Sequence, residues 1–464
     1  MKKITTPIIP VQSYLVKNNQ AKEIDFKAIC LFAATGFFWE KDTYWKNQKV
    51  LNPASFHQLS DTGKLISSAP YFNWHYQPDR NLKFNDALEE FTHLFETIIA
   101  EQIGNQQAIL PISGGLDSRS QAVALRHLGK EVTSYSYSFS GGYSESGIAK
   151  KIAKACNFKF QEFFIPKGYL WDVIEDLAEI NGCYSEFTHP RQMAVLPEFN
   201  KMKGVFCLGH WGDVLFDKGA SENYTEEDLV PLVVKKVVKK GGLEFAKALW
   251  NSWGLEGNFK SYLESRIQEL LNQIDIDHIG AKMRAFKSQF WAPRWTSVNL
   301  SIFEKAHPIS VPYYDNRMCE FICKVPEKYL ADRRLQIAYI QKRNPAVAKI
   351  TWEDQRPFNL NNYQYNKMPY NLPFKVSRKL KAGVNKVQQK KFIQRNWELQ
   401  FLGKENEKQL QNYLFENDLQ DFIPEKITKN FYKKFQEKDS VNYSHPISML
   451  LTFSIWYQQK NLNI

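Results

Sequence analysis

The residues with the clearest chemical signal are Ser113–Ser118, which read Ser-Gly-Gly-Leu-Asp-Ser. The apolar run Ala108–Ile112 before them has the composition of a buried strand, and Gln121–Leu128 after them has that of a helix. Gly114 and Gly115 allow the backbone to approach a ligand closely. The free N–H groups of a first helical turn attract anions. The stretch therefore predicts a phosphate-binding loop between a strand and a helix.

Asp117 narrows the chemistry of this loop. A Walker-type loop carries a Lys before its Ser or Thr, whereas Asp117 stands before Ser118. A carboxylate among phosphate-binding amides fits a magnesium ion that bridges the phosphates. The loop resembles that of the ATP pyrophosphatases, Ser-Gly-Gly-x-Asp-Ser, which binds the pyrophosphate released when ATP is cut at its α-phosphate. The alternative is a Ser/Gly turn in which Asp117 or Ser118 is an ordinary helix N-cap.

The elements around the loop alternate between helix and strand. A helical stripe covers Asp86–Gln102, strands are expected at Val132–Phe139 and Phe160–Ile165, and a helix starts at Ser144 between them. Such alternation predicts a parallel sheet with right-handed crossovers. Ligands of these sheets bind beyond the carboxyl ends of the strands, where the loop would lie.

Two later motifs follow the loop in the chain. Gly209–Asp213 reads Gly-His-Trp-Gly-Asp after a short apolar run, and Val311–Asp315 reads Val-Pro-Tyr-Tyr-Asp. Asparagine synthetases and their relatives carry a pyrophosphate loop, a glycine-rich acidic segment and a Val-Pro-Phe-Leu-Asp segment in this order. The chain resembles that family, within the PP-loop superfamily, over roughly residues 85–360. The resemblance implies an α/β fold of the adenine nucleotide α-hydrolase type, a parallel sheet flanked by helices.

The resemblance also implies roles for residues. Asp117 and Asp213 would hold magnesium pyrophosphate, because two carboxylates beside a triphosphate repel each other without a divalent cation. ATP and Mg²⁺ are thus the expected cofactors, with the nucleotide bound by Ser113, Gly114, Gly115, Ser118 and Gly209. By position, Ile112 and Tyr137 would flank the adenine. Tyr137 is explained equally well as an inward-facing strand residue.

His210 departs from the asparagine synthetases, which carry a Glu in the second motif. Lasso-peptide cyclases of the same superfamily often have Gly-His-Gly-Gly-Asp there, so they and the β-lactam synthetases are the expected nearest types. A neutral His, with an ordinary pKa of about 6.5, can accept a proton from an attacking amine. The alternative is a structural hydrogen bonder near the edge of the sheet.

The family lysine is also replaced. It follows the segment that here reads Ile350–Phe358, and the matching position is Gln355 or Arg356. Arg356 would keep a positive charge over the pyrophosphate or the reacting intermediate. We therefore expect His210 and Arg356 to be catalytic.

Three regions are expected along the chain. Residues 1–84 form a β-rich segment resembling a truncated glutaminase domain, 85–360 the ATP pyrophosphatase domain, and 361–464 a basic helical region. No cysteine precedes Cys30, which lies in the apolar run Ala28–Phe32 and is expected to be buried. We therefore predict that the protein does not hydrolyse glutamine. Its nitrogen would come from free ammonia, a partner's glutaminase or an amine on the substrate.

Composition narrows the class of protein. No run of eighteen apolar residues predicts a membrane span, and the six scattered cysteines are typical of the reduced cytoplasm. The net charge of +12 indicates an anionic partner. Lys375–Arg395 carries eight Lys or Arg and no acidic residue. This stretch is either a solvated helix face or a binding surface. Lys235–Lys240 is expected to be a solvated face.

These observations favour an ATP-dependent amide-forming ligase. A small-molecule or peptide carboxylate would be adenylated with release of pyrophosphate, and ammonia or an amine would then displace AMP. A separate glutaminase or a substrate-carrying protein is a possible partner. One alternative is a nucleic-acid-modifying ATP pyrophosphatase, in which the basic stretch would hold tRNA phosphates. Another is a non-catalytic relative that binds a nucleotide.

Overall fold

The loop lies at the end of the central strand of a parallel sheet. The computed structural model describes residues 1–16, 23–139, 146–187, 191–221, 223–377 and 400–462. Its main sheet has the order β6 (Lys159–Ile165), β5 (Val132–Phe139), β4 (Ala108–Pro111), β7 (Val205–Cys207) and β8 (Ile309–Ser310). All four neighbouring pairs are parallel. The first three residues of β4 are fully buried, which explains its unbroken apolar sequence. The predicted parallel sheet is confirmed.

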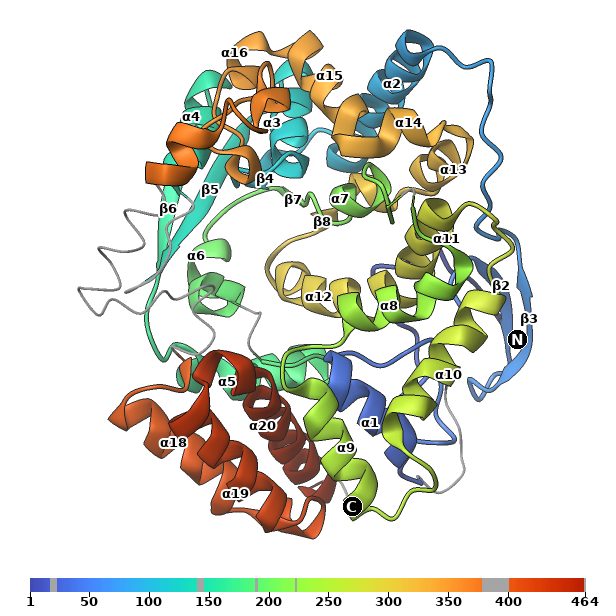
Figure 1. Cartoon of the computed structure of the whole chain (residues 1–464), viewed down its shortest axis with the longest axis vertical. Coiled ribbons are helices and arrows are strands. Elements are labelled where there is room, and N and C mark those ends of the chain that lie inside the picture. Colours follow the sequence, from blue (N-terminus) through green and yellow to red (C-terminus); the bar gives the residue numbers. More distant parts are fainter. Residues whose placement is uncertain (17–22, 140–145, 188–190, 222, 378–399, 463–464) are drawn as a thin grey trace.

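Helices flank this sheet, as expected (Figure 1). On one side lie α2 (Phe84–Ile103), α3 (Asp117–His127), α4 (Ser146–Ala155) and α15 (Arg334–Arg343). On the other side, Phe206 of β7 packs its ring against Phe199 of α6 (Leu196–Phe199) and Phe303 of α12 (Ser297–Ala306). Phe91 and Phe95 of α2 extend the core to Tyr339 of α15. Both faces of the sheet are therefore closed, and the carboxyl ends of the strands are left to bind a ligand.

The N-terminal segment contains a helix that the sequence did not predict. In the segment expected to be β-rich, strands β1 (Lys2–Thr5), β2 (Ser55–Leu59) and β3 (Leu65–Pro70) form an antiparallel sheet. Between β1 and β2, however, α1 (Phe26–Thr35) is capped by Asp25 and buries eight of its ten residues. A helix that is apolar on all sides lacks the periodic polar face that identifies an amphipathic helix. Cys30 is fully buried within it, as expected.

The C-terminal region is helical, as predicted. Helices α18 (Lys404–Phe415), α19 (Glu425–Lys433) and α20 (Ser440–Leu462) pack beside α1 and α9 (Gly242–Ser252), away from the main sheet (Figure 1). His445 of α20 lies 2.9 Å from the carbonyl oxygen of Ala33. Most of the basic stretch Lys375–Arg395 lies outside the described residues. The division into 1–84, 85–360 and 361–464 stays a prediction.

The remaining elements connect these parts. They are α5 (Leu170–Asn181), α7 (Gly212–Leu215), α8 (Leu229–Val237), α10 (Phe259–Asn272), α11 (Ile279–Phe286), α13 (Asn316–Lys324), α14 (Glu327–Leu330) and α16 (Pro345–Ala348), with short 3₁₀ turns. In the part of the chain that the structure describes, no helix has both the length and the apolarity needed to cross a bilayer.

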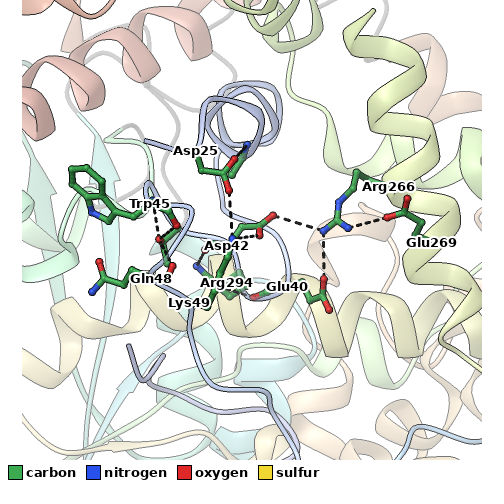
Figure 2. Close-up of polar contacts among 11 residues, drawn as sticks. Asp25, Glu40, Asp42, Trp45, Gln48, Lys49, Arg266, Glu269 and Arg294 are labelled. Atoms are coloured by element: carbon green, nitrogen blue, oxygen red, sulfur yellow. Dashed lines mark hydrogen bonds and ion pairs between the residues drawn. The ribbon is translucent and has the colours of Figure 1, made fainter. Parts of the chain in front are cut away.

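A π-helix, η3 (Lys287–Thr296), joins α11 to α12. Pro293 lies inside it and has no N–H to complete an α-helical turn, which accounts for the wider turn. Arg294 is buried and donates to the carbonyl oxygens of Glu40 and Asp42 at 2.7 and 2.8 Å. Arg266 of α10 contacts the side chains of the same two residues (Figure 2). These contacts fix η3 against the N-terminal segment.

Candidate functional site

A pocket of about 570 Å³ opens at the carboxyl ends of β4, β5 and β7. One side of it, here called the loop wall, consists of the loop Ser113–Ser118 and the motif Gly209–Asp213. Nine residues of the expected site line this pocket: Ile112, Ser113, Gly115, Asp117, Ser118, Tyr137, Gly209, His210 and Asp213. Gly114 and Arg356 are not among the lining residues. The structure therefore brings together two motifs that lie about ninety residues apart in the sequence.

The loop is held by its own polar groups and by one buried arginine. The Ser113 N–H donates to Ser118 Oγ at 3.1 Å, and α3 begins at Asp117. Arg119 is fully buried and donates to the carbonyl oxygens of Gly114 at 3.1 Å, Ile350 at 3.0 Å and Thr351 at 2.8 Å. These three bonds fasten the glycine turn to a distant segment of the chain.

Glycine is required where the second motif meets the first. A Cβ atom on Gly212 would lie 2.2 Å from Asp117 Oδ1, and one on Gly209 would lie 3.1 Å from the Ser118 nitrogen. Both distances are closer than side chains normally approach. The glycines of Gly209–Asp213 are therefore explained by contact with the start of α3.

Asp117 lies in a charged and largely buried environment. Arg333 contacts its carboxylate, and Gln336 Nε2 donates to Asp117 Oδ1 at 3.0 Å. Burial raises the pKa of Asp117 to about 6, while Arg333 lowers it and Asp213 raises it. Asp213 is exposed on the pocket side of α7. The two predicted carboxylates thus line one pocket, and Asp213 favours the protonated form of Asp117.

Arg333 and Gln336 were not found from the sequence. Arg333 has a left-handed backbone, with φ of +64°, and directly precedes α15. The surrounding Asp-Arg-Arg sequence belongs to no motif. The motif Val311–Asp315 contacts Gln336. Its buried Tyr313 accepts a hydrogen bond from Gln336 at 2.9 Å. Asp315 instead caps α13, so its carboxylate is used structurally.

The edge of the pocket at β5 fits an aromatic ligand. Tyr137 is nearly buried, and the Arg191 guanidinium lies 5.0 Å from its ring centroid. Ser136 also lines the pocket, and its buried Oγ has no hydrogen-bond partner among the described residues. Ile112 directly follows the neighbouring strand β4, so the expected adenine position has an aliphatic side chain, the ring of Tyr137 and the Ser136 hydroxyl.

His210 lies inside the pocket as a neutral imidazole. Burial lowers its pKa to about 4; Asp213 raises that pKa and Arg191 lowers it. Its Nδ1 is buried without a hydrogen-bond partner in the described part of the chain. The next residue, Trp211, has φ of +78° and donates from Nε1 to Ser288 Oγ of η3 at 2.9 Å. The second motif is thereby attached to the π-helix.

Arg356 lies near the loop but not on the pocket surface. Its guanidinium pairs with Glu353 at 2.6 Å, and the Glu353 N–H donates to the Gly114 carbonyl oxygen at 3.2 Å. A Cβ on Gly114 would lie 2.5 Å from Glu353 Oε2. The segment therefore packs on the outside of the glycine turn, and a catalytic role for Arg356 stays a prediction.

A second side of the pocket was not expected from the sequence. This lysine–tryptophan wall consists of Lys236, Lys239, Lys287, Trp291 and Trp295. Burial lowers the pKa of Lys287 to about 8, while Asp213 raises it. The expectation of a solvated face is confirmed for Lys235, Lys236 and Lys240, which are exposed, although Lys236 also lines the pocket. It is wrong for Lys239, which is partly buried at the pocket. Helix α8 ends at Val237, and the turn after it brings Lys239 to the pocket.

The loop wall suits a magnesium–nucleotide complex. Mg²⁺ is commonly held by one or two carboxylates together with substrate phosphates. Asp117 and Asp213 supply the carboxylates, and the loop supplies N–H groups for the phosphates. Within the described ranges, no group of three His, Cys, Asp or Glu side chains would hold a metal by itself.

Comparison with known proteins agrees with this geometry. A family model described as asparagine synthase matches residues 91–458. The structure of an NMN synthetase from Francisella tularensis is 13% identical, covers 44% of this chain and 93% of its own, and has a TM-score of 0.23. That similarity is too low to support an inference. No curated protein matches the chain significantly.

Proposed function

Because the chain belongs to the asparagine synthase family of ATP-dependent amidating ligases, we propose that it adenylates a carboxylate and transfers the acyl group to nitrogen. One observation carries the proposal: Asp117, Asp213 and the glycine turn lie in one pocket at the carboxyl end of the central strand. This arrangement combines anion-binding amides with two carboxylates suited to a divalent cation.

In the first step, a carboxylate oxygen of the substrate attacks the α-phosphorus of ATP. The bond between the α-phosphorus and the bridging oxygen breaks, and pyrophosphate leaves. The loop N–H groups and the hydroxyls of Ser113 and Ser118 bind the departing pyrophosphate, where negative charge accumulates. Asp117 and Asp213 would hold magnesium, which would neutralise phosphate charge. Tyr137 and Ile112 orient the adenine.

In the second step, ammonia or an amine attacks the acyl carbon and AMP leaves. The attacking nitrogen must lose a proton, and His210 lies in the pocket in its neutral, accepting form. A base with a pKa of about 4 holds a proton weakly. An anionic acyl-adenylate beside the ring raises that pKa, since nearby negative charge favours the protonated imidazole. His210 therefore becomes a better base when the intermediate is present.

Glutamine hydrolysis by a cysteine of this chain is not part of the proposal. All six cysteines are buried, and burial raises the pKa of the Cys30 thiol well above its usual value. A buried protonated thiol is a poor nucleophile. We expect ammonia to replace glutamine as the nitrogen source in the assay. Release of glutamate that survives Cys30→Ala would contradict this expectation.

The test is product analysis with the purified full chain. Carboxylic acids are screened with ATP and Mg²⁺, and the nucleotide products are separated by chromatography. We expect AMP and pyrophosphate, together with exchange of labelled pyrophosphate into ATP. Asp117→Asn should abolish that exchange, because it removes a charge that the metal requires. Formation of ADP and phosphate by the wild type would overturn the proposal.

A further inference from the structure

The lysine–tryptophan wall has no role in the two steps above, although it borders the same pocket. Lys287, Trp291 and Trp295 recur every fourth residue along η3, and Lys236 and Lys239 come from the end of α8 and the turn that follows. The wall therefore combines two separate elements.

Among the residues that the structure describes, no carboxylate is in direct contact with the lysines of this wall, although Asp213 lies near enough to raise the pKa of Lys287. Within the described part of the chain, none of Lys236, Lys239 and Lys287 has a carboxylate within 4.0 Å. The two acidic residues lining the pocket are Asp117 and Asp213, and Asp117 already contacts Arg333. Grouping three cations in a pocket is unfavourable unless an anion joins them. The wall is thus suited to a ligand with several negative charges.

Exposure changes along the wall. Lys287 and Lys239 are partly buried, whereas Lys236 is exposed. The three ammonium groups therefore extend from the interior of the pocket to its rim. A compact anion would contact only one end of this series, whereas an extended chain would contact all of it.

The contacts of the two tryptophan rings favour a peptide ligand over a nucleic acid. The ring of Trp291 stacks on Phe37 with centroids 5.8 Å apart, and Lys287 Nζ lies 5.7 Å from its centroid. Lys239 Nζ lies 4.9 Å from the centroid of Trp295. The rings thus hold the protein's own ammonium groups by cation–π contact. Nucleic acids instead need open aromatic faces on which bases stack.

We infer that the lysine–tryptophan wall binds an acidic peptide, one carboxylate of which is the group activated at the loop wall. The activation of that carboxylate rests on the proposed function, whereas the binding of the peptide does not. Carboxylates along the peptide would pair with Lys287, Lys239 and Lys236 in turn, from the interior outward.

The test measures binding separately from chemistry. Fluorescently labelled hexaglutamate is titrated with the full-length protein and followed by anisotropy, with saturating Mg²⁺ and α,β-methylene-ATP, which cannot be cut at the α-phosphate. Hexaglutamine and an oligothymidylate of equal length are the comparison ligands. We expect hexaglutamate to bind most tightly and to weaken as salt is raised, since salt screens charge.

The chain offers a closely matched control for this test. Lys236→Gln/Lys239→Gln should weaken hexaglutamate binding by about tenfold or more, the effect of removing two charge contacts. Lys235→Gln/Lys240→Gln removes the same charge from the same six residues, but outside the pocket, and should change binding by less than about twofold. Lys287→Gln should also weaken binding, and α,β-methylene-ATP affinity should persist in all three proteins.

The outcomes separate this inference from the proposed function. Equal binding of hexaglutamine, tighter binding of oligothymidylate, or equal losses in the two double variants would overturn the inference. Loss of nucleotide affinity without loss of peptide affinity would overturn it too, because the lysines would then serve ATP. Asp117→Asn should lose nucleotide binding yet keep hexaglutamate binding. If the protein bound the peptide but made no AMP with any carboxylate, the inferred peptide binding would stand and the proposed adenylation would be refuted.

Discussion

The two sides of the pocket differ in how they are built. The loop wall depends on backbone groups: a turn that needs Gly114, and a second motif whose Gly209 and Gly212 lie against α3. The lysine–tryptophan wall depends on long side chains that reach the pocket from η3 and the end of α8. Close backbone contacts permit few residue types, whereas a lysine reaches the same point from many positions. The loop wall is therefore recognisable as a sequence motif, whereas the lysine–tryptophan wall is not.

The most direct way to disrupt the loop wall is to add a side chain where its two motifs lie closest together. Gly212→Ala places a Cβ 2.2 Å from Asp117 Oδ1, so Asp117 or α7 must move. We expect pyrophosphate exchange to fall by about a hundredfold or more, because small displacements of catalytic groups have effects of that size. Gly147→Ala adds the same methyl group where nothing lies within 4 Å, and should keep full activity. Similar exchange rates in both variants would show that the contact is unimportant.

A second variant separates the chemical steps within the loop wall. His210→Ala should leave pyrophosphate exchange nearly unchanged while amide formation falls by about a hundredfold, the usual scale for a lost general base. The measurement compares exchange with single-turnover amide formation in one preparation. Equal loss in both assays would assign His210 a structural role.

A third variant removes hydrogen bonds that hold the loop from behind and leaves its pocket surface unchanged. Arg119→Met keeps much of the side-chain volume but removes the donors to three carbonyl oxygens. We expect the free energy of unfolding to fall by about 3 kcal/mol, because buried acceptors are left unpaired. Denaturant titration gives this value. Arg126→Met, on the exposed side of the same helix, should change it by less than about 0.5 kcal/mol. Matching values for the two variants would contradict the fastening role.

A fourth variant tests the pH dependence of stability. The pKa of His210 is about 4 in the folded protein, below the value of about 6.5 for an unfolded chain. The unfolded state therefore binds the extra proton first, and stability falls as the pH drops from about 6.5 to about 4. Above this range His210 has no such effect. His210→Asn should reduce the slope in denaturant titrations between these pH values, and an unchanged slope would mean that His210 is not buried as a neutral ring.

Particular residues show how far sequence reasoning reached. Asp117, Asp213 and His210 line one pocket, and glycines and strand ends mark their surroundings in the sequence, while their roles stay predictions. Arg333 was missed because its position depends on a left-handed backbone that nothing in Asp-Arg-Arg announces. Helix α1 was missed because burial on all sides removes the helical period. Lys239 was misassigned because a run of lysines does not reveal which member faces a cavity.

The bonds of Arg119 have a consequence for the newly made chain. Two of its acceptors, Ile350 and Thr351, follow it by 231 and 232 residues. A ribosome that has added residue 349 has therefore produced the whole nucleotide loop but neither of these acceptors. Contacts so distant in sequence form late, because a long segment must first be closed into a loop. During translation, the affinity for ATP should thus appear only after Thr351 has been added, well after the glycine turn itself has left the ribosome.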